Sequence, residues 1–446
     1  MISEKAEVLA TVQREWTLGW FLVSLTVFLP TAYFTPLGIP ALLFLTGVPL
    51  LYHLGDIRVF PWLAGLTTAV VVLAVARSEV VALMLHGTGI AQAYVTAPHY
   101  YVALIFVLIM GWAVVLAARA LDDGRAALLM RWFLWLMLVF TGLLLLEAVT
   151  RTGLHHWLNV HVFMSTRPDL ALVKVSNSNC ALLMMFWPLA LYCMHRERPQ
   201  FITATVVAIA AAAWVTDTNA QLMALAASAA VFFATRYWPR GWSMRGVTPE
   251  RVAAAGAGLF MLLFPALIYG LMTTGVAERI KDDLLPSWSQ RIDIWTFTVA
   301  RSLEKPWWGW GYEASRRFMP IIPDHPHSMS LQAWLELGVP GLVLVAAFWF
   351  ALFWAMGTPE DFVAVAAVDK TGLRGLDDTP AAARDMTFSQ RVRPYVMAQA
   401  VAYFVINTVS YGLWRSWYFC LGLMAAAVMI IAIKAARHEM KLRIKL

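Results

Sequence analysis

Two histidines stand beside an acidic residue, just before a long apolar segment, in the run Asp324-His325-Pro326-His327-Ser328. Proline disfavours helical backbone in the residue before it, so we expect His325 to be extended. Ser328 is a good helix N-cap, which predicts that His327 lies at the positive end of the next helix. That position favours an anion and lowers the pKa of a histidine. A neutral His327 could then accept a proton.

Basic residues gather in two polar connections of the chain. Seven lie between residues 276 and 330: Arg279, Lys281, Arg291, Arg301, Lys305, Arg316 and Arg317. Three more lie between residues 151 and 179: Arg151, Arg167 and Lys174. Such side chains bind phosphate and other anions, so an anionic ligand is the simplest use for them. A single histidine is more often structural, but two histidines, an aspartate and a helix start in an arginine-rich loop favour function.

A helix is predicted from Ser287 or Ser289 to about Glu304, where a proline follows. Arg291 and Trp295 are four residues apart and therefore share one face of it. The next residues, 307–312, read WWGWGY and predict a glycine-hinged aromatic turn. Its aromatic rings suit the lipid headgroup level.

Aromatic side chains of this region have two possible uses. Trp295 and Tyr312 could form a platform for sugar rings, or they could be interfacial anchors. The polar run at residues 176–179, which ends in Asn179, could cap a helix or offer amides to a phosphate or sugar. Glu336, two turns inside an apolar segment, is a functional suspect unless it pairs with a basic neighbour. His155, His156 and His161 lack zinc-ligand partners at convincing spacing, so we predict no metal and no cofactor.

The composition predicts an all-α integral membrane protein. Of 446 residues, 60% are hydrophobic and 14% are charged, against about 25% charged in soluble proteins. Apolar runs near 20 residues long cross a bilayer as helices. We predict about twelve spans, near residues 18–34, 37–53, 60–76, 98–118, 132–149, 180–194, 201–216, 220–235, 252–275, 331–355, 394–412 and 416–434.

The Lys and Arg residues predict the orientation of these spans. Most of the 34 fall on the side of the two termini, which places both termini in the cytoplasm. The expected organisation is nine spans in residues 1–275, an outward loop with short helices in 276–330, and three spans in 331–446. The last part includes a cytoplasmic loop at 357–394. The net charge of +7 follows from orientation and anionic membrane lipid, so no nucleic-acid partner is needed.

The order of these residues resembles the O-antigen ligase and polymerase superfamily. The pattern is Arg291…Trp295…Pro306…Gly309-x-Gly311, then His325-x-His327-Ser328…Leu331…Glu336-x-Gly338…Gly341-Leu342, preceded by Asn177-Ser178-Asn179. It covers roughly residues 170–345. Members often have Asn where this chain has Ser328, and many have a Ser-Arg pair where it has Thr218-Asn219. The second phosphate-binding cation must therefore come from elsewhere, with Arg167, Lys174 and Arg151 as candidates.

The resemblance implies a GT-C-like glycosyltransferase of the bacterial inner membrane, with its catalytic loop in the periplasm. Its donor would be an O-antigen polysaccharide on undecaprenyl diphosphate, and its acceptor a hydroxyl of lipid A–core oligosaccharide. His327 would be the general base, and Arg291 would bind the diphosphate. His325 would orient its neighbour or touch the acceptor phosphate. Further contacts to diphosphate or sugar would come from Asn179, Arg316, Arg317, Trp295 and Tyr312.

Several alternatives remain open from the sequence. An O-antigen polymerase or a protein O-oligosaccharyltransferase has a similar plan. A transporter or flippase of an anionic lipid-linked substrate is the alternative outside enzymes. A transporter should carry its ionisable residues near the bilayer midplane, on interrupted helices with internal repeats. The suspects here cluster at one outward boundary instead.

Overall fold

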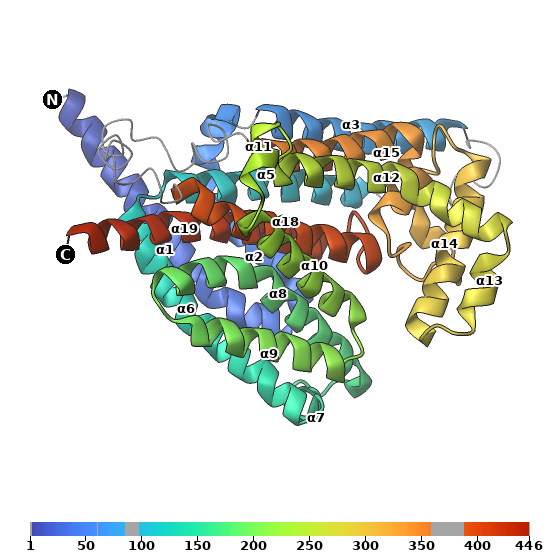
Figure 1. Ribbon diagram of the computed structural model, residues 1–446, viewed down its shortest axis with the longest axis horizontal. Helices are drawn as coiled ribbons and strands as arrows, with labels where there is room; N and C mark the ends of the chain where they lie inside the picture. Colours follow the sequence, from blue (N-terminus) through green and yellow to red (C-terminus); the bar gives the residue numbers. More distant parts are fainter. Residues whose placement is uncertain (1, 60, 85–97, 358–387, 446) are drawn as a thin grey trace.

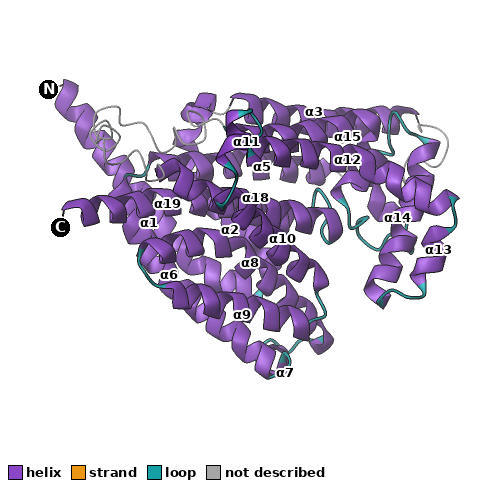
Figure 2. Cartoon of the chain, viewed as in Figure 1, coloured by secondary structure: helices purple, strands orange, loops and turns teal. Residues whose placement is uncertain are grey.

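The structure is a computed structural model that describes residues 2–59, 61–84, 98–357 and 388–445, and these are helices joined by loops, with no strand among them (Figure 2). The long helices are α1 (Ile2–Phe34), α3 (Pro61–Met84), α5 (Pro98–Ala120), α6 (Asp123–Val149), α8 (Ala171–His195), α9 (Pro199–Val215), α10 (Asn219–Arg236), α12 (Pro249–Thr273), α14 (Pro286–Glu304), α15 (Met329–Ala355), α18 (Phe388–Val409) and α19 (Ser416–Lys445). The shorter ones are η1 (Pro36–Gly38), α2 (Ile39–Gly47), η2 (Val48–Val59), α7 (Gly153–His161), η3 (Pro168–Leu170), α11 (Arg240–Met244), α13 (Val276–Lys281) and η4 (Ala314–Arg317).

Eight helical segments of the described chain are long and apolar enough to cross a membrane. They lie on α1, on η1 to η2, and on α5, α6, α8, α12, α15 and α19. Each of the other four predicted spans falls on a helix (α3, α9, α10 or α18) whose described residues do not meet both criteria. The all-α membrane class is therefore confirmed, and the number twelve stays a prediction.

The helices form one bundle with α19 in its interior. This helix packs against α5, α6 and α8, while α12 pairs with α15 and α10 with α18. Both termini lie at one end of the long axis, and α13 and α14 stand at the other end (Figure 1). The outward loop predicted at residues 276–330 therefore lies far from the termini.

A separate apolar cluster fixes α14 to the bundle. Trp295 and Val299 of α14 pack with Phe264 and Ile268 of α12 and with Leu335 of α15. These side chains are almost fully excluded from solvent. Burying a large apolar side chain contributes about 1.5–3 kcal/mol, so α14 is a firmly held platform rather than a loose loop.

Helix α15 is broken at Gly338, where φ is +70°. The loop after α14 closes the gap, because Trp310 N donates to Leu335 O (2.8 Å) and Gly311 N donates to Glu336 O (2.9 Å). A Cβ at Gly338 would lie 2.3 Å from the carbonyl oxygen of Trp307, and L-residues avoid this φ. Glycine thus lets the loop satisfy backbone groups that the break exposes.

Three sequence-based boundaries need correction. Helix α8 begins at Ala171 rather than near 180, so residues 176–179 lie inside it and do not cap it. Helix α14 begins at Pro286 with Leu285 at its N-cap, so neither Ser287 nor Ser289 has that role, although it ends at Glu304 as predicted. Residues 388–394, assigned to a loop, begin α18. Most of the predicted cytoplasmic loop, 358–387, and residues 85–97 lie outside the described residues.

Candidate active site

The two histidines share one hydrogen-bond acceptor. Nε2 of His325 lies 3.1 Å, and Nδ1 of His327 2.5 Å, from the backbone carbonyl oxygen of Ser410, which follows α18. A carbonyl oxygen only accepts, so each of these ring nitrogens carries a proton. In a neutral imidazole the other nitrogen is then an acceptor. His327 therefore presents Nε2 as a base.

The backbone and the capping residue hold His327 in this orientation. Its φ is +54°, a left-handed value that is uncommon outside glycine and often marks functional sites. Ser328 caps α15 as predicted, with its hydroxyl accepting from Leu331 N at 3.5 Å. His327 thus ends the loop directly before the helix.

Burial keeps both imidazoles neutral. It lowers the pKa of His327 to about 3, and the charge of Arg291 and protonation of the neighbouring His325 both act in the same direction. Burial also lowers the pKa of His325 to about 4. The predicted lowering for His327 is confirmed, but its main cause is desolvation rather than the helix end.

Arg291 is held at the residue next to Ser410. Its Nε donates to Val409 O (2.9 Å) and its Nη1 to Ser287 O (2.7 Å), and the guanidinium stacks over the Trp288 ring. Within the described residues no hydrogen bond or ion pair is made by Nη2. The structure thus brings Arg291, His325 and His327 together around two consecutive carbonyl groups.

The two predicted aromatic contacts are buried. Trp295 is 6% exposed, and its Nε1 donates to Pro326 O at 3.0 Å, which braces the peptide between the histidines. Tyr312 is 3% exposed and meets the ring of Trp414 edge to face at 5.1 Å. Neither ring offers an open face to a sugar, so both are placed as supports of the site.

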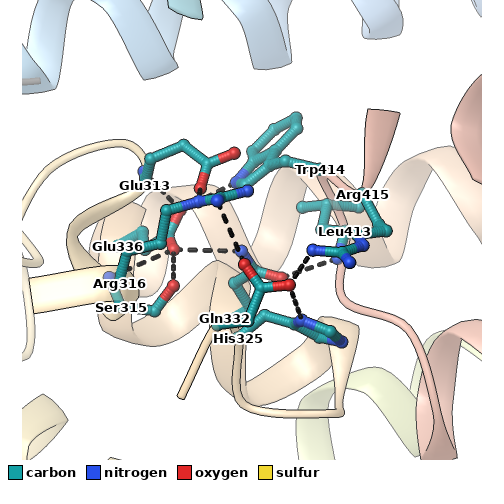
Figure 3. A network of polar contacts seen from close by, with 10 residues as sticks. Glu313, Ser315, Arg316, His325, Gln332, Glu336, Leu413, Trp414 and Arg415 are labelled. Carbon is teal, nitrogen blue, oxygen red and sulfur yellow. Dashed lines mark hydrogen bonds and ion pairs between the residues drawn. The ribbon is translucent and has the colours of Figure 1, made fainter. Parts of the chain in front are cut away.

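Glu336 joins three segments beside the histidines (Figure 3). Its carboxylate accepts from Glu313 N (2.8 Å), Ser315 Oγ (2.6 Å), Gln332 Nε2 (3.0 Å) and Trp414 Nε1 (2.8 Å). These partners are neutral donors, so pairing with a basic neighbour was the wrong alternative. Glu336 is fully buried and fixes η4, α15 and the segment before α19 to one another.

The remaining predicted cations are split between two places. Arg316 on η4 pairs with Asp324, 3.0 Å from Nη1 to Oδ1, and with Glu313; Arg317 is its neighbour on η4. Arg167 forms an exposed pair with Asp169 (2.8 Å). Arg316 is linked to the histidine loop through Asp324.

The candidates around α7 and α8 lie apart from the histidines in the contact network. Arg151 is exposed in the turn before α7. Lys174 donates to Asn159 (2.7 Å), and Asn179 is fully buried and donates to Gln221 (2.6 Å) and to a backbone carbonyl. We find no described contact that joins any of these three to Arg291 or the histidines. The neighbouring Asn177, however, accepts from the hydroxyl of Tyr411 at 2.9 Å.

The segment 409–415, between α18 and α19, is the main part of the site that sequence reasoning missed. Besides the two carbonyl acceptors, it supplies Leu413 N, which donates to Gln332 Oε1 (2.7 Å), and the indole of Trp414. It ends in Arg415, which pairs with Asp324. Backbone acceptors leave no sequence signature. Arg415 does have a sequence signature, because it is a cation in a short connection predicted to face outward.

No three His, Cys, Asp or Glu side chains of the described chain lie close enough together to hold a metal ion. The predicted independence from metal is not tested by this observation and stays a prediction. The acidic side chains nearest the histidines, Asp324 and Glu313, are engaged by arginine.

Residues 204–346 match a family model described as O-Antigen ligase. The chain is 22% identical over 188 residues to a protein of Rickettsia conorii named "Putative polysaccharide ligase RC0486", and equally to a "Putative polysaccharide ligase" of Rickettsia felis. The similarity covers 39% of this chain and 38–39% of each relative, so it spans less than half of their length. The matched segment contains Arg291, His325 and His327. Over that segment the chain is similar to the O-antigen ligase family, in agreement with the resemblance of its motif order.

Proposed function

We propose that the chain is an O-antigen ligase, which transfers a polysaccharide from undecaprenyl diphosphate to a hydroxyl of lipid A–core oligosaccharide. The supporting observation is the geometry around residues 409–410. One carbonyl orients His327 so that Nε2 is a free base, and the adjacent carbonyl anchors Arg291 with one guanidinium nitrogen left for a ligand. The family match and the names of the relatives support the same class of reaction.

The proposed reaction is a direct displacement. His327 Nε2 takes the proton of the acceptor hydroxyl while its oxygen bonds to the anomeric carbon, and the bond from that carbon to the diphosphate oxygen breaks. The electron pair leaves on the diphosphate, and the anomeric centre is inverted. Negative charge therefore grows on the leaving group. Arg291 stabilises it, and each charge-assisted contact contributes about 1.5–3 kcal/mol.

In this proposal residues 276–330 are the periplasmic catalytic loop, and both termini are in the cytoplasm of an inner-membrane protein. The position of α13 and α14 at the end opposite the termini supports this orientation (Figure 1). The proposed plan keeps helices 1–9 in residues 1–275 and helices 10–12 in residues 331–446. No metal ion is required, because the arginines balance the leaving charge.

The break in α15 gives a transporter some support, because interrupted helices bearing ionisable groups are typical of transporters. Here, however, the loop at 306–311 fills the break, and neutral donors saturate Glu336. The polymerase and the protein O-oligosaccharyltransferase differ from the ligase only in their acceptor.

Reconstitution separates these functions. The purified chain would be placed in vesicles with undecaprenyl-diphosphate-linked glycan and lipid A–core. Glycan on lipid A–core supports the ligase, and lengthened lipid-linked glycan supports a polymerase. Glycan attached to an added protein supports an oligosaccharyltransferase. Movement of intact donor across the bilayer without a new bond supports a transporter.

A further inference from the structure

A cluster of charged residues lies beside His325, and its centre is the carboxylate of Asp324. Oδ1 of Asp324 lies 3.0 Å from Nη1 of Arg316, and Oδ2 pairs with Nη1 of Arg415. Figure 3 labels both arginines and His325. Oδ2 is also 3.4 Å from Nδ1 of His325. One small anion thus holds two guanidinium groups, each on a different oxygen, against the histidine pair.

The two arginines come from parts of the chain that are distant in sequence and that the carboxylate of Glu336 also joins. Arg316 belongs to η4, and Arg415 immediately precedes α19. Their charges repel each other, so the arrangement needs an anion between them. A phosphate group likewise offers several oxygens that can accept charge-assisted hydrogen bonds from guanidinium groups.

Arg415 has unused capacity for such a ligand. Its side chain is 29% exposed, while its Nε is buried without a hydrogen-bond partner in the described residues. A buried unpaired donor costs free energy, and a second anionic oxygen would recover it. Asp324 is 30% exposed, so its carboxylate can turn out toward solvent.

We propose that Asp324 occupies the binding site of the donor's diphosphate in the resting protein, and that Arg415, with Arg316, forms its second cationic half opposite Arg291. Arriving diphosphate displaces the Asp324 carboxylate and takes over its two arginines. This inference rests on the proposed function and supplies the second phosphate-binding cation. It replaces Arg151, Arg167 and Lys174 in that role.

The arrangement has a physical advantage for the reaction. Without ligand, the carboxylate of Asp324 offsets the repulsion between the guanidinium groups of Arg316 and Arg415. Once displaced by a diphosphate, it leaves both arginines to stabilise the charge that grows as the sugar bond breaks. Because the segment that ends in Arg415 also carries the carbonyl of Ser410, the anion site and the base are aligned through one short stretch of backbone.

The test uses inorganic pyrophosphate as probe and the purified full-length chain, with binding measured by titration calorimetry at constant ionic strength. Arg415→Gln should weaken binding by about tenfold or more, since a charge-assisted contact is lost. Asp324→Asn should tighten it by roughly threefold or more, since a competing anion is removed. In a chain that already carries Arg415→Gln, Asp324→Asn should increase the affinity for pyrophosphate much less. Lys281→Gln, in a partly exposed pair with Asp293, is the matched control and should change nothing.

Opposite results overturn the proposal: weaker or unchanged binding in Asp324→Asn, or unchanged binding in Arg415→Gln. Arg415→Lys keeps the charge, and an affinity between those of wild type and Arg415→Gln supports the site if the glutamine variant does not fold. The transfer assay separates this site from the proposed function. Full transfer by Arg415→Gln with unchanged pyrophosphate affinity removes the site and keeps the ligase. If the pyrophosphate affinities are as predicted but the wild-type chain transfers no glycan, the anion site is supported and the ligase function is refuted.

Discussion

Replacing Arg291 with lysine tests the diphosphate contact while keeping the charge. In the structure the guanidinium uses Nε for Val409 O and Nη1 for Ser287 O, which leaves Nη2 for the ligand. A lysine ammonium is a single nitrogen that cannot hold two carbonyls and reach a phosphate in the same geometry. One charge-assisted contact, about 1.5–3 kcal/mol, is therefore lost in the transition state, which lowers kcat/KM by about 10- to 150-fold.

The assay is transfer of glycan to lipid A–core by purified protein in vesicles, with kcat and KM measured separately. Loss in kcat indicates a contact made in the transition state, whereas loss in KM alone indicates uniform binding. Arg301→Lys is the matched control, because Arg301 lies on the same helix in an exposed pair with Glu304. Equal turnover of Arg291→Lys and Arg301→Lys would refute the diphosphate contact.

Three further outcomes follow from the site. Because its pKa is low, His327 stays neutral in mild acid, and kcat/KM should stay level from pH 7 to about 5. A fall in kcat/KM centred near pH 6.5 would argue against His327 as the base. The pKa of His325 is about 4 in the folded chain and 6.5 in the unfolded chain. As the pH is lowered, the unfolded chain therefore takes up the proton before the folded chain does, and thermal scans should show stability falling from about pH 6.5 toward pH 4. Gly338→Ala should lower the unfolding temperature, because its Cβ would overlap Trp307 O, while Gly256→Ala, with open space around it, should not.

The sequence predicted those parts of the fold that the bilayer imposes. Apolar length placed the predicted spans on helical backbone, since backbone groups in lipid must be paired within the segment. Local rules also placed the Ser328 cap and the end of α14 at Glu304. Local rules failed at α8, whose polar residues 176–179 lie inside the helix because their side chains find partners on α1, on α10 and in the segment after α18.

The site was only partly predictable. Arg291, His325 and His327 stand out by residue type, and the structure brings them together. Their common anchor is the backbone of residues 409–410, more than 80 residues later, and any residue type presents such carbonyls. Trp295 was predicted as a possible sugar platform, but its indole is buried against Pro326, a long-range packing effect that periodicity on one helix cannot show.

The most direct measurement is glycan transfer to lipid A–core by the purified His327→Ala variant in vesicles. The control is His156→Ala, which replaces an exposed histidine of α7. A base with Nε2 facing the acceptor predicts that His156→Ala works as wild type, and that His327→Ala inserts normally but loses transfer by about 100-fold or more. Near-normal transfer by a correctly inserted His327→Ala would contradict the mechanism.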